Sequence, residues 1–524
     1  MNYKLLGKVL GKIMILESIL MIAPLIVTFV YKEGFKNHIA FLIPIIALAT
    51  LGLLMQKPKP KRTSFYQKEG FALTSLVWIV MTLFGAVPFA INGEIPNYID
   101  ACFEIMSGFT TTGASIVTDI TALSHSSLFW RSFSHWIGGM GILVFVLIFI
   151  PESNDGSSMH LLRAESPGPQ VGKIASKMKV TARILYLIYF CLTLIEVIIL
   201  ACGPLVDNEA LISAGYAPYN SDKLFHALLA SFGSAGTGGF GFIPNSFEFF
   251  TPFAQYVVSI FLIIFGCNFA LYYLILLGKV KEVFKSEEFK AYIIILITAI
   301  SLIFVNLLMN IESFGYTTEE SFRHSLFQVA SIITTTGYST TDFNMWPMVS
   351  KMVIVILMFT GAMAGSTAGG IKLSRIVMAI KGTYVNVRKL INPRYVPKTK
   401  FEGKSLEEKT TNDVFSFITL YLFVLVFVTL ILSFDPVNDT AIKMSSDLAE
   451  SGEYVVNHGF FSNFSASLSC ISNIGPGFEA IGPYGSFANY NWFSTLILTF
   501  TMLLGRLEIL PVIILFTPRT WKKT

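Results

Sequence analysis

The chain has 524 residues, of which 53% are hydrophobic and only 14% are charged, against roughly 25% charged in an average soluble domain. This composition excludes an ordinary water-soluble enzyme and predicts a polytopic membrane protein embedded in a lipid bilayer. The formal net charge of +5 comes from basic residues that lie between apolar runs, so it indicates membrane orientation and no nucleic-acid partner.

Apolar runs long enough to cross about 30 Å of hydrocarbon recur along the whole chain. They lie at 10–31, 39–55, 70–92, 129–150, 180–202, 251–278, 289–310, 350–380, 413–434 and 491–516. Four weaker segments, near 99–111, 223–236, 321–334 and 459–472, are too short or too polar to span and run into stretches rich in Gly, Thr and Ser. We interpret them as re-entrant helices, so the predicted fold is all-α.

Lysine and arginine gather at one side of these spans. Clusters begin at Lys4, Lys57, Arg163, Lys279, Lys381 and Arg519. The positive-inside rule then predicts that both termini lie in the cytoplasm.

The four polar-ended segments each lead into a similar loop, and the loops align on one glycine. The aligned residues are Thr111, Thr112 and Gly113; Thr237, Gly238 and Gly239; Thr335, Thr336 and Gly337; and Asn473, Ile474 and Gly475. The sequence therefore predicts a two-helix extension at 1–60 and four membrane–pore-loop–membrane repeats with pseudo-fourfold symmetry. The repeats occupy 61–152, 153–285, 286–405 and 406–524.

Loops of this kind have a specific chemistry inside a membrane. Irregular backbone at membrane depth is tolerated where it lines a water-filled path, and short helices that enter from outside aim their negative C-terminal ends at the bilayer centre. Glycine lets carbonyls turn inward, and the run 335–339 parallels the T-V-G-Y-G filter of potassium channels. The pattern therefore favours loops that bind a monovalent cation. The alternative is that the four loops are turns that only connect packed helices.

The run 236–241 also satisfies G-x-G-x-x-G, the pattern of a dinucleotide-binding turn. No strand precedes it, and no acidic residue follows at about 20 residues, so we reject that interpretation. No nucleotide-hydrolysis motif and no Ser/His/Asp arrangement is visible, so the chain is not predicted to be an enzyme or to carry an organic cofactor.

The span predicted at 350–380 contains an unusual density of small residues at 361–370. Close helix packing is one explanation. A broken helix is the other, with a flexible loop that obstructs the pore and acts as a gate. The gate residues are Gly365, Ser366, Thr367, Ala368, Gly369 and Gly370.

Two further sets of charged residues have predicted roles. Arg506 lies near the middle of the span at 491–516, and intramembrane arginine is costly unless it faces a cavity or a partner. We expect it to face the pore below the loops, to hinder cations and to bind carbonyls of the gate. Acidic side chains are candidates for concentrating cations at the outer mouth: Asp100, Glu104, Asp119 and Asp342.

These motifs together resemble the Trk/Ktr/HKT superfamily of potassium transporters, and within it the TrkH/TrkG type of bacterial uptake subunit. The resemblance covers essentially the whole chain. It is carried by the stretches 110–113, 136–141, 266–269, 334–343, 364–372, 473–478 and 505–508.

The resemblance implies a potassium-uptake protein of the Trk system in the plasma (inner) membrane, with potassium ions bound in a filter at the four aligned glycines. It also implies a homodimer, and regulation by a separate cytosolic ring protein, TrkA-like, that binds NAD or ATP and docks on the basic cytoplasmic loops. In related plant transporters a serine at the first filter glycine accompanies sodium selectivity. This chain has Gly113 there, which favours potassium.

Two alternatives remain open at the level of sequence. A sodium-permeable or sodium-coupled transporter, including a symporter, is compatible with the same scaffold. An alternating-access carrier for an organic solute predicts two matching halves, whereas this sequence has four matching quarters.

Overall fold

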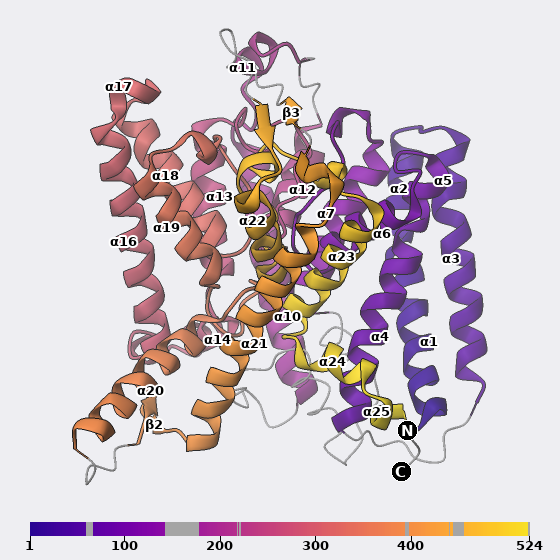
Figure 1. Ribbon diagram of the computed structural model, residues 1–524. Helices are drawn as coiled ribbons and strands as arrows, with labels where there is room; N and C mark the ends of the chain where they lie inside the picture. The colour runs from indigo at the N-terminus through magenta and orange to yellow at the C-terminus, as the bar shows by residue number, and fades with distance from the viewer. Residues whose placement is uncertain are drawn as a thin grey trace.

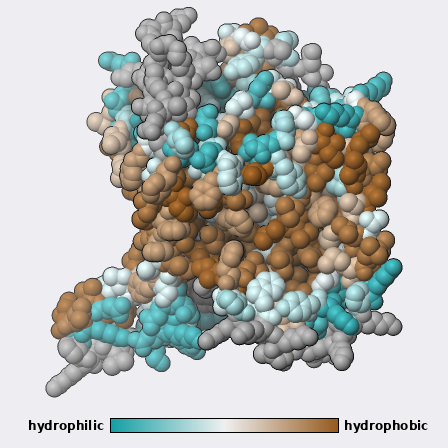
Figure 2. Space-filling view, turned by 45° about the vertical axis from the view of Figure 1, so that its right-hand side comes forward, coloured by the Kyte–Doolittle hydropathy of each residue, from teal (hydrophilic) through white to brown (hydrophobic). Residues whose placement is uncertain are grey.

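The structure is a bundle of helices with an apolar belt. This computed structural model describes residues 1–58, 67–141, 178–216, 218, 222–392, 398–439, 441–443 and 455–521. Most helices run roughly parallel to one axis (Figure 1). A broad brown band of apolar side chains crosses the molecule between two more hydrophilic ends (Figure 2). The chain is therefore an all-α, multi-pass membrane protein, as predicted.

Six helical segments in the described part of the chain are long and apolar enough to span a membrane. They are Tyr3–Val30, Phe35–Gln56, Glu69–Asn92, Val180–Cys202, Glu287–Met309 and Glu408–Leu432. These correspond to six of the predicted apolar runs.

The first five helices form one side of the bundle (Figure 1). Their bounds are α1 (Tyr3–Leu20), α2 (Ile22–Val30), α3 (Phe35–Gln56), α4 (Gln67–Gly85) and α5 (Val87–Asn92). Helices α1 and α3 approach closely because Gly11 and Gly52 face each other. A methyl group on Gly11 would lie 2.7 Å from the Gly52 carbonyl oxygen, so small residues set this helix crossing.

All four segments predicted as short helices are helical. They are α6 (Tyr98–Phe109), α12 (Lys223–Gly236), α18 (Thr318–Ile333) and α22 (Phe460–Ser472). Each precedes another helix on which it packs: α7 (His125–Gly139), α13 (Pro252–Phe265), α19 (Met348–Phe359) and α23 (Trp492–Arg506). Helix contacts form a closed circuit in the order α6, α7, α12, α13, α18, α19, α22, α23 and back to α6. The four loops therefore meet inside one ring of helices.

Three of the other spans are interrupted; the prediction of a continuous helix was wrong for 251–278 and 491–516, and the predicted break at 350–380 is confirmed. The run 251–278 bends by 90° between α13 and α14 (Phe269–Leu276). The run 350–380 is interrupted between α19 and α20 (Leu373–Ile391), which is the break predicted for the gate. The run 491–516 breaks between α23 and α24 (Leu510–Phe516), where Glu508 and Ile509 have positive φ and Pro511 starts the next helix. Of the run 129–150, positions 142–150 lie outside the described residues.

The remaining elements complete the ends of the bundle. The helices are α10 (Met178–Cys202), α11 (Asn208–Ser213), α15 (Val280–Val283), α16 (Glu287–Met309), α17 (Ile311–Phe314), α21 (Glu408–Leu432) and α25 (Pro518–Trp521). Two small hairpins pair β1 (Lys400–Phe401) with β2 (Lys404–Ser405) and β3 (Ala441–Lys443) with β4 (Val455–Asn457).

The start of α1, α25 and β2 lie at one end of the molecule, and α11, α17 and β3 lie at the other (Figure 1). The Tyr3 hydroxyl donates to the Trp521 carbonyl at 2.7 Å, which ties the two ends of the chain together. We call this end the terminus side. Of the predicted basic clusters, Arg163 lies outside the described residues.

Candidate ion pathway

The four short helices end in the same backbone geometry. The first aligned residue of each loop has a left-handed conformation, with φ of 54° at Thr111, 53° at Thr237, 55° at Thr335 and 56° at Asn473. The N–H of the next residue donates to a carbonyl five positions back, at 2.8 Å in the first three loops and 3.0 Å in the fourth. This is a Schellman-type helix end, in which glycine is the usual left-handed residue.

Three of these left-handed positions are threonine, which is a poor choice for local stability. A β-branched residue at positive φ is a genuine outlier, and such strain costs about 1–3 kcal/mol per residue and collects at functional sites. The aligned glycines two residues later are also left-handed, with φ of 79° at Gly113 and Gly239, 88° at Gly337 and 106° at Gly475. Unfavourable geometry repeated in register indicates a site shaped for a ligand.

The loops contact one another in cyclic order through carbonyl groups. A methyl group built on Gly113 would lie 2.1 Å from the Gly238 oxygen, one on Gly239 1.8 Å from the Thr336 oxygen, and one on Gly337 2.0 Å from the Ile474 oxygen. The ring closes because a methyl group on Gly475 would lie 2.8 Å from the Thr112 oxygen. Glycine is required at all four positions, since any side chain would displace a neighbouring carbonyl.

The ring is suited to a cation. The leading threonines and Asn473 are fully buried, and the C-terminal ends of the four short helices meet there with their partial negative charge. Carbonyl oxygens at such a site can replace the hydration shell of a monovalent cation.

The fold also explains why the second loop has Gly238 where the first and third have threonine. The ring of His135 on α7 fills the space of a side chain, since a methyl group on Gly238 would lie 2.1 Å from His135 Cγ. The Phe240 N–H donates to His135 Nε2 at 3.2 Å, and His135 Nδ1 lies 2.8 Å from the Gly108 oxygen. Because Nε2 accepts, the proton is on Nδ1, and a neutral imidazole joins the first two quarters. Sequence analysis missed His135, although the departure at Gly238 was its signal.

The role predicted for Glu104 at the outer mouth was wrong. Its side chain is fully buried, and its carboxylate lies 2.7 Å from Arg131 Nε, itself 1% exposed. The carboxylate accepts from the Ile116 N–H at 2.8 Å, and Arg131 donates to the Gly241 oxygen at 3.1 Å. This buried ion pair joins the first and second loops just beyond their aligned glycines.

Two of the other three acidic candidates make local hydrogen bonds. Asp119 and Asp342 cap single 3-10 turns by accepting from the N–H groups of Thr121 and Asn344, both at 2.9 Å. Burial raises the pKa of the Asp342 carboxyl above its ordinary value. Asp100 lies in the first turn of α6.

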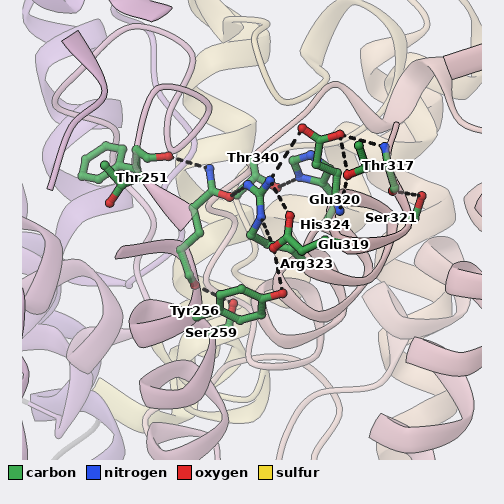
Figure 3. A network of polar contacts seen from close by, with 12 residues as sticks. Thr251, Tyr256, Ser259, Thr317, Glu319, Glu320, Ser321, Arg323, His324 and Thr340 are labelled. Atoms are coloured by element: carbon green, nitrogen blue, oxygen red, sulfur yellow. Dashed lines mark hydrogen bonds and ion pairs between the residues drawn. The ribbon is translucent and has the colours of Figure 1, made fainter. Parts of the chain in front are cut away.

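Polar side chains of α18 and α13 form a network next to the third loop (Figure 3). On α18, Arg323 donates to Glu319 at 2.9 Å and also to Gln255 on α13. Gln255 donates in turn to the Phe247 oxygen at 2.8 Å. The neighbouring His324 lies 2.8 Å from the Thr340 hydroxyl, just beyond the aligned glycine. The network holds the outer end of this loop against α13.

Below the ring, the chain between α19 and α20 forms an intramembrane loop at residues 360–372. Its ends are joined because the Gly361 N–H donates to the Ile371 oxygen at 2.8 Å. The Gly369 N–H donates to the Thr335 hydroxyl at 2.6 Å. A methyl group on Gly369 would lie 2.5 Å from the Ser472 oxygen. The loop therefore contacts the third and fourth of the four aligned loops from the terminus side.

The remaining predicted gate residues lie in the same loop. Gly365 and Gly370 have left-handed φ of 76° and 65°. The Gly365 oxygen accepts from the Phe269 N–H at 3.0 Å. The Ser366 hydroxyl donates to the Met363 oxygen at 2.6 Å, and the Ala368 oxygen accepts from the Lys372 ammonium. The bend between α13 and α14 therefore contacts the loop.

Arg506 is the last residue of α23 and not a mid-helix residue, because the helix ends there. Its guanidinium donates to the Thr367 oxygen at 3.0 Å, to the Thr111 hydroxyl at 3.1 Å, to the Gly139 oxygen at 2.9 Å and to the Gly138 oxygen. Arg506 therefore joins the intramembrane loop to the first quarter of the ring, and contact with a loop carbonyl is what the sequence predicted.

A bundle with an apolar belt (Figure 2), in which four glycine loops meet in a closed ring of backbone contacts, is typical of a polytopic membrane transport protein. Comparison with known proteins identifies its family. The TrkH family model, described as a cation transport protein, matches residues 33–523. This chain belongs to the TrkH family.

Similarity extends over the whole length of individual relatives. The Trk system potassium uptake protein TrkH of Salmonella typhimurium is 31% identical over 529 residues, covering all of both chains. TrkG of Escherichia coli K12 is 28% identical, over 98% of this chain and 97% of the relative. The crystal structure of the potassium transporter TrkH from Vibrio parahaemolyticus covers all of both chains with a TM-score of 0.80 at 28% identity.

Proposed function

We propose that this protein takes up potassium ions across the plasma (inner) membrane through the carbonyl ring. The ion is coordinated by the backbone of Thr111, Thr112, Gly113, Thr237, Gly238, Gly239, Thr335, Thr336, Gly337, Asn473, Ile474 and Gly475. The observation that carries the proposal is the ring itself, with four left-handed residues at φ of 53° to 56° and four glycines each facing a carbonyl of the next loop. The relatives named as potassium uptake proteins support the choice of ion.

The gate in this proposal is the intramembrane loop together with Arg506. The loop lies against the ring on the terminus side, and the guanidinium adds a fixed positive charge where a cation would leave. Conduction requires the loop to move, and Arg506 holds it in place. No catalytic group is needed for such transport.

The terminus side is the cytoplasmic side in this proposal. The basic residues at the start of α1, the end of α20 and the β1–β2 hairpin support that orientation. A homodimer, and regulation by a cytosolic ring protein that binds NAD or ATP, follow from the family resemblance.

Growth of a potassium-uptake-deficient host at low external potassium tests the function. The intact chain is expected to restore growth, and single Ala replacements of Gly113, Gly239, Gly337 and Gly475 are expected to abolish it at normal expression. Flux into vesicles with potassium or sodium as the only permeant cation tests selectivity. Equal fluxes would favour the sodium-permeable alternative, and rescue by all four variants would refute the ring as the pathway.

A further inference from the structure

A single carboxylate oxygen links the intramembrane loop to the first turn of α20. Glu288, in the first turn of α16, accepts from the Ala364 N–H at 2.7 Å and from the Ser374 N–H at 3.0 Å, both through Oε1. Ala364 precedes the glycine-rich part of the loop, and Ser374 lies in the first turn of α20. The Glu288 side chain is almost completely buried. Its carboxylate therefore couples the position of Ala364 in the loop to the start of α20.

The first turn of α16 is held in turn by the β1–β2 hairpin. The hairpin has a two-residue turn, Glu402 and Gly403, with φ of 50° and 71°, as expected for a tight type I′ connection. The Glu402 carboxylate accepts from the Glu288 N–H at 3.1 Å and from the Ser286 hydroxyl at 2.8 Å. The hairpin thus reaches the backbone of the residue whose side chain holds the loop.

The hairpin is anchored on one face and exposed on the other, because Phe401 is buried with Met378 and Val414 while Lys400 and Lys404 are exposed. Each strand has two residues. Glu287 also fixes the hairpin turn, since its carboxylate accepts from the Glu402 N–H at 3.2 Å and from Lys381 at 2.6 Å. That ion pair is more than one-third exposed on both side chains, and such pairs add little stability. Nearby exposed lysines make the surface basic: Lys398, Lys400, Lys404 and Lys409.

We propose that Glu288 is a positioning residue for the gate, and that the β1–β2 hairpin is the lever that moves it. An acidic surface that binds the hairpin lysines and pulls Glu402 away displaces the first turn of α16. Glu288 then releases the N–H groups of Ala364 and Ser374, and the loop leaves the ring. The inference rests on the proposed gating function and adds to it the route by which a signal from the terminus side enters.

Loop release is measured independently of ion flux by the accessibility of a thiol. Ser366→Cys places a thiol in the loop. The rate at which a charged reagent modifies this thiol is measured, and the background rate of the same chain with Ser366 intact is subtracted. Glu288→Ala is expected to raise this rate and the basal potassium flux by about fivefold or more. Glu288→Gln keeps a carbonyl oxygen that accepts both N–H groups, so it is expected to stay near the parent values.

Glu282→Gln is the matched control, since it removes the same charge close by at an exposed pair with Lys279. It is expected to change neither measurement. A folded Glu288→Ala variant with the parent rate of thiol modification would overturn the role of Glu288. Absence of potassium flux in every variant would refute the proposed function, while the thiol measurement would still decide the inference.

The hairpin is tested by Glu402→Ala, alone and combined with Glu288→Ala. Substitutions at two residues that act through the same contacts have non-additive effects. The single Glu402 variant is expected to raise thiol modification, and the double variant to match Glu288→Ala. If the effects of the two substitutions on thiol modification add fully, or if Glu402→Ala has no effect, the proposed role of the hairpin is wrong.

Discussion

Replacing Arg506 by alanine is expected to open the pathway without ligand or partner. The guanidinium makes bonds to Gly138, Gly139 and Thr111, which belong to the first quarter of the ring, and one bond to Thr367 in the intramembrane loop. Among these bonds, the one to Thr367 is lost when the loop moves away from the ring. A hydrogen bond to a charged group contributes about 1.5–3 kcal/mol.

That single bond sets the expected size of the effect. Losing about 1.5–3 kcal/mol from the closed state changes the closed-to-open ratio by roughly 10- to 150-fold. Removing the positive charge also lowers the barrier for a cation at the exit. Basal potassium flux in reconstituted vesicles should therefore rise by at least about tenfold, up to the point where most molecules are open.

The flux assay includes two control variants. Arg388→Ala, at an exposed arginine of α20, controls for the loss of one charge and should leave flux unchanged. Arg506→Lys keeps the charge but not the planar fork that reaches several carbonyls, and should fall between the two. A folded Arg506→Ala protein with the parent flux would refute the reasoning, because the loop would then be held without the arginine.

Three other predictions follow from the ring and its supports. Gly113→Ser puts a side chain against the Gly238 oxygen and should raise the sodium-to-potassium flux ratio; an unchanged ratio would argue against the ring as the filter. Gly238→Ala should abolish flux because its methyl group meets the imidazole, and a second change, His135→Ala, should restore part of it; no restoration would mean that the clash is not the cause. Glu104→Gln should lower the free energy of unfolding by about 3–5 kcal/mol by leaving Arg131 buried and unpaired, measured by chemical or thermal unfolding, whereas a loss below about 1 kcal/mol would contradict the pairing.

Much of this fold is predictable from sequence because the membrane restricts the choices. Apolar length identifies helices such as α3 and α16, and polar helices that run into Gly and Thr identify α6 and α18. The alignment on Gly113 and its three counterparts also selects the residues that the structure brings into one ring. Periodicity and glycine content are local signals, so one sequence is enough to find them.

Other features depend on contacts between distant segments. Glu104 looks like a surface acid until α7 brings Arg131 beside it. Glu288 lies at the edge of an apolar run, and only the folded chain places it against a loop 76 residues away. The ends of α13 and α23 were predicted too late because apolar side chains continue past the breaks at Asn268 and Glu508. Hydropathy records composition and not backbone direction, so these breaks are invisible to it.

The carbonyl ring is built from four loops of one chain, and this has a consequence for how selectivity can change. In a ring of identical subunits, one mutation alters every quarter at once. Here a mutation alters one quarter and leaves three intact, so intermediate selectivities are reachable one residue at a time. Asn473 and Gly238 already illustrate this freedom. Asn473 donates to Thr112 of the next loop at 2.9 Å, and Gly238 leaves space for the His135 ring. The four loops therefore share one backbone conformation but have different side-chain neighbours.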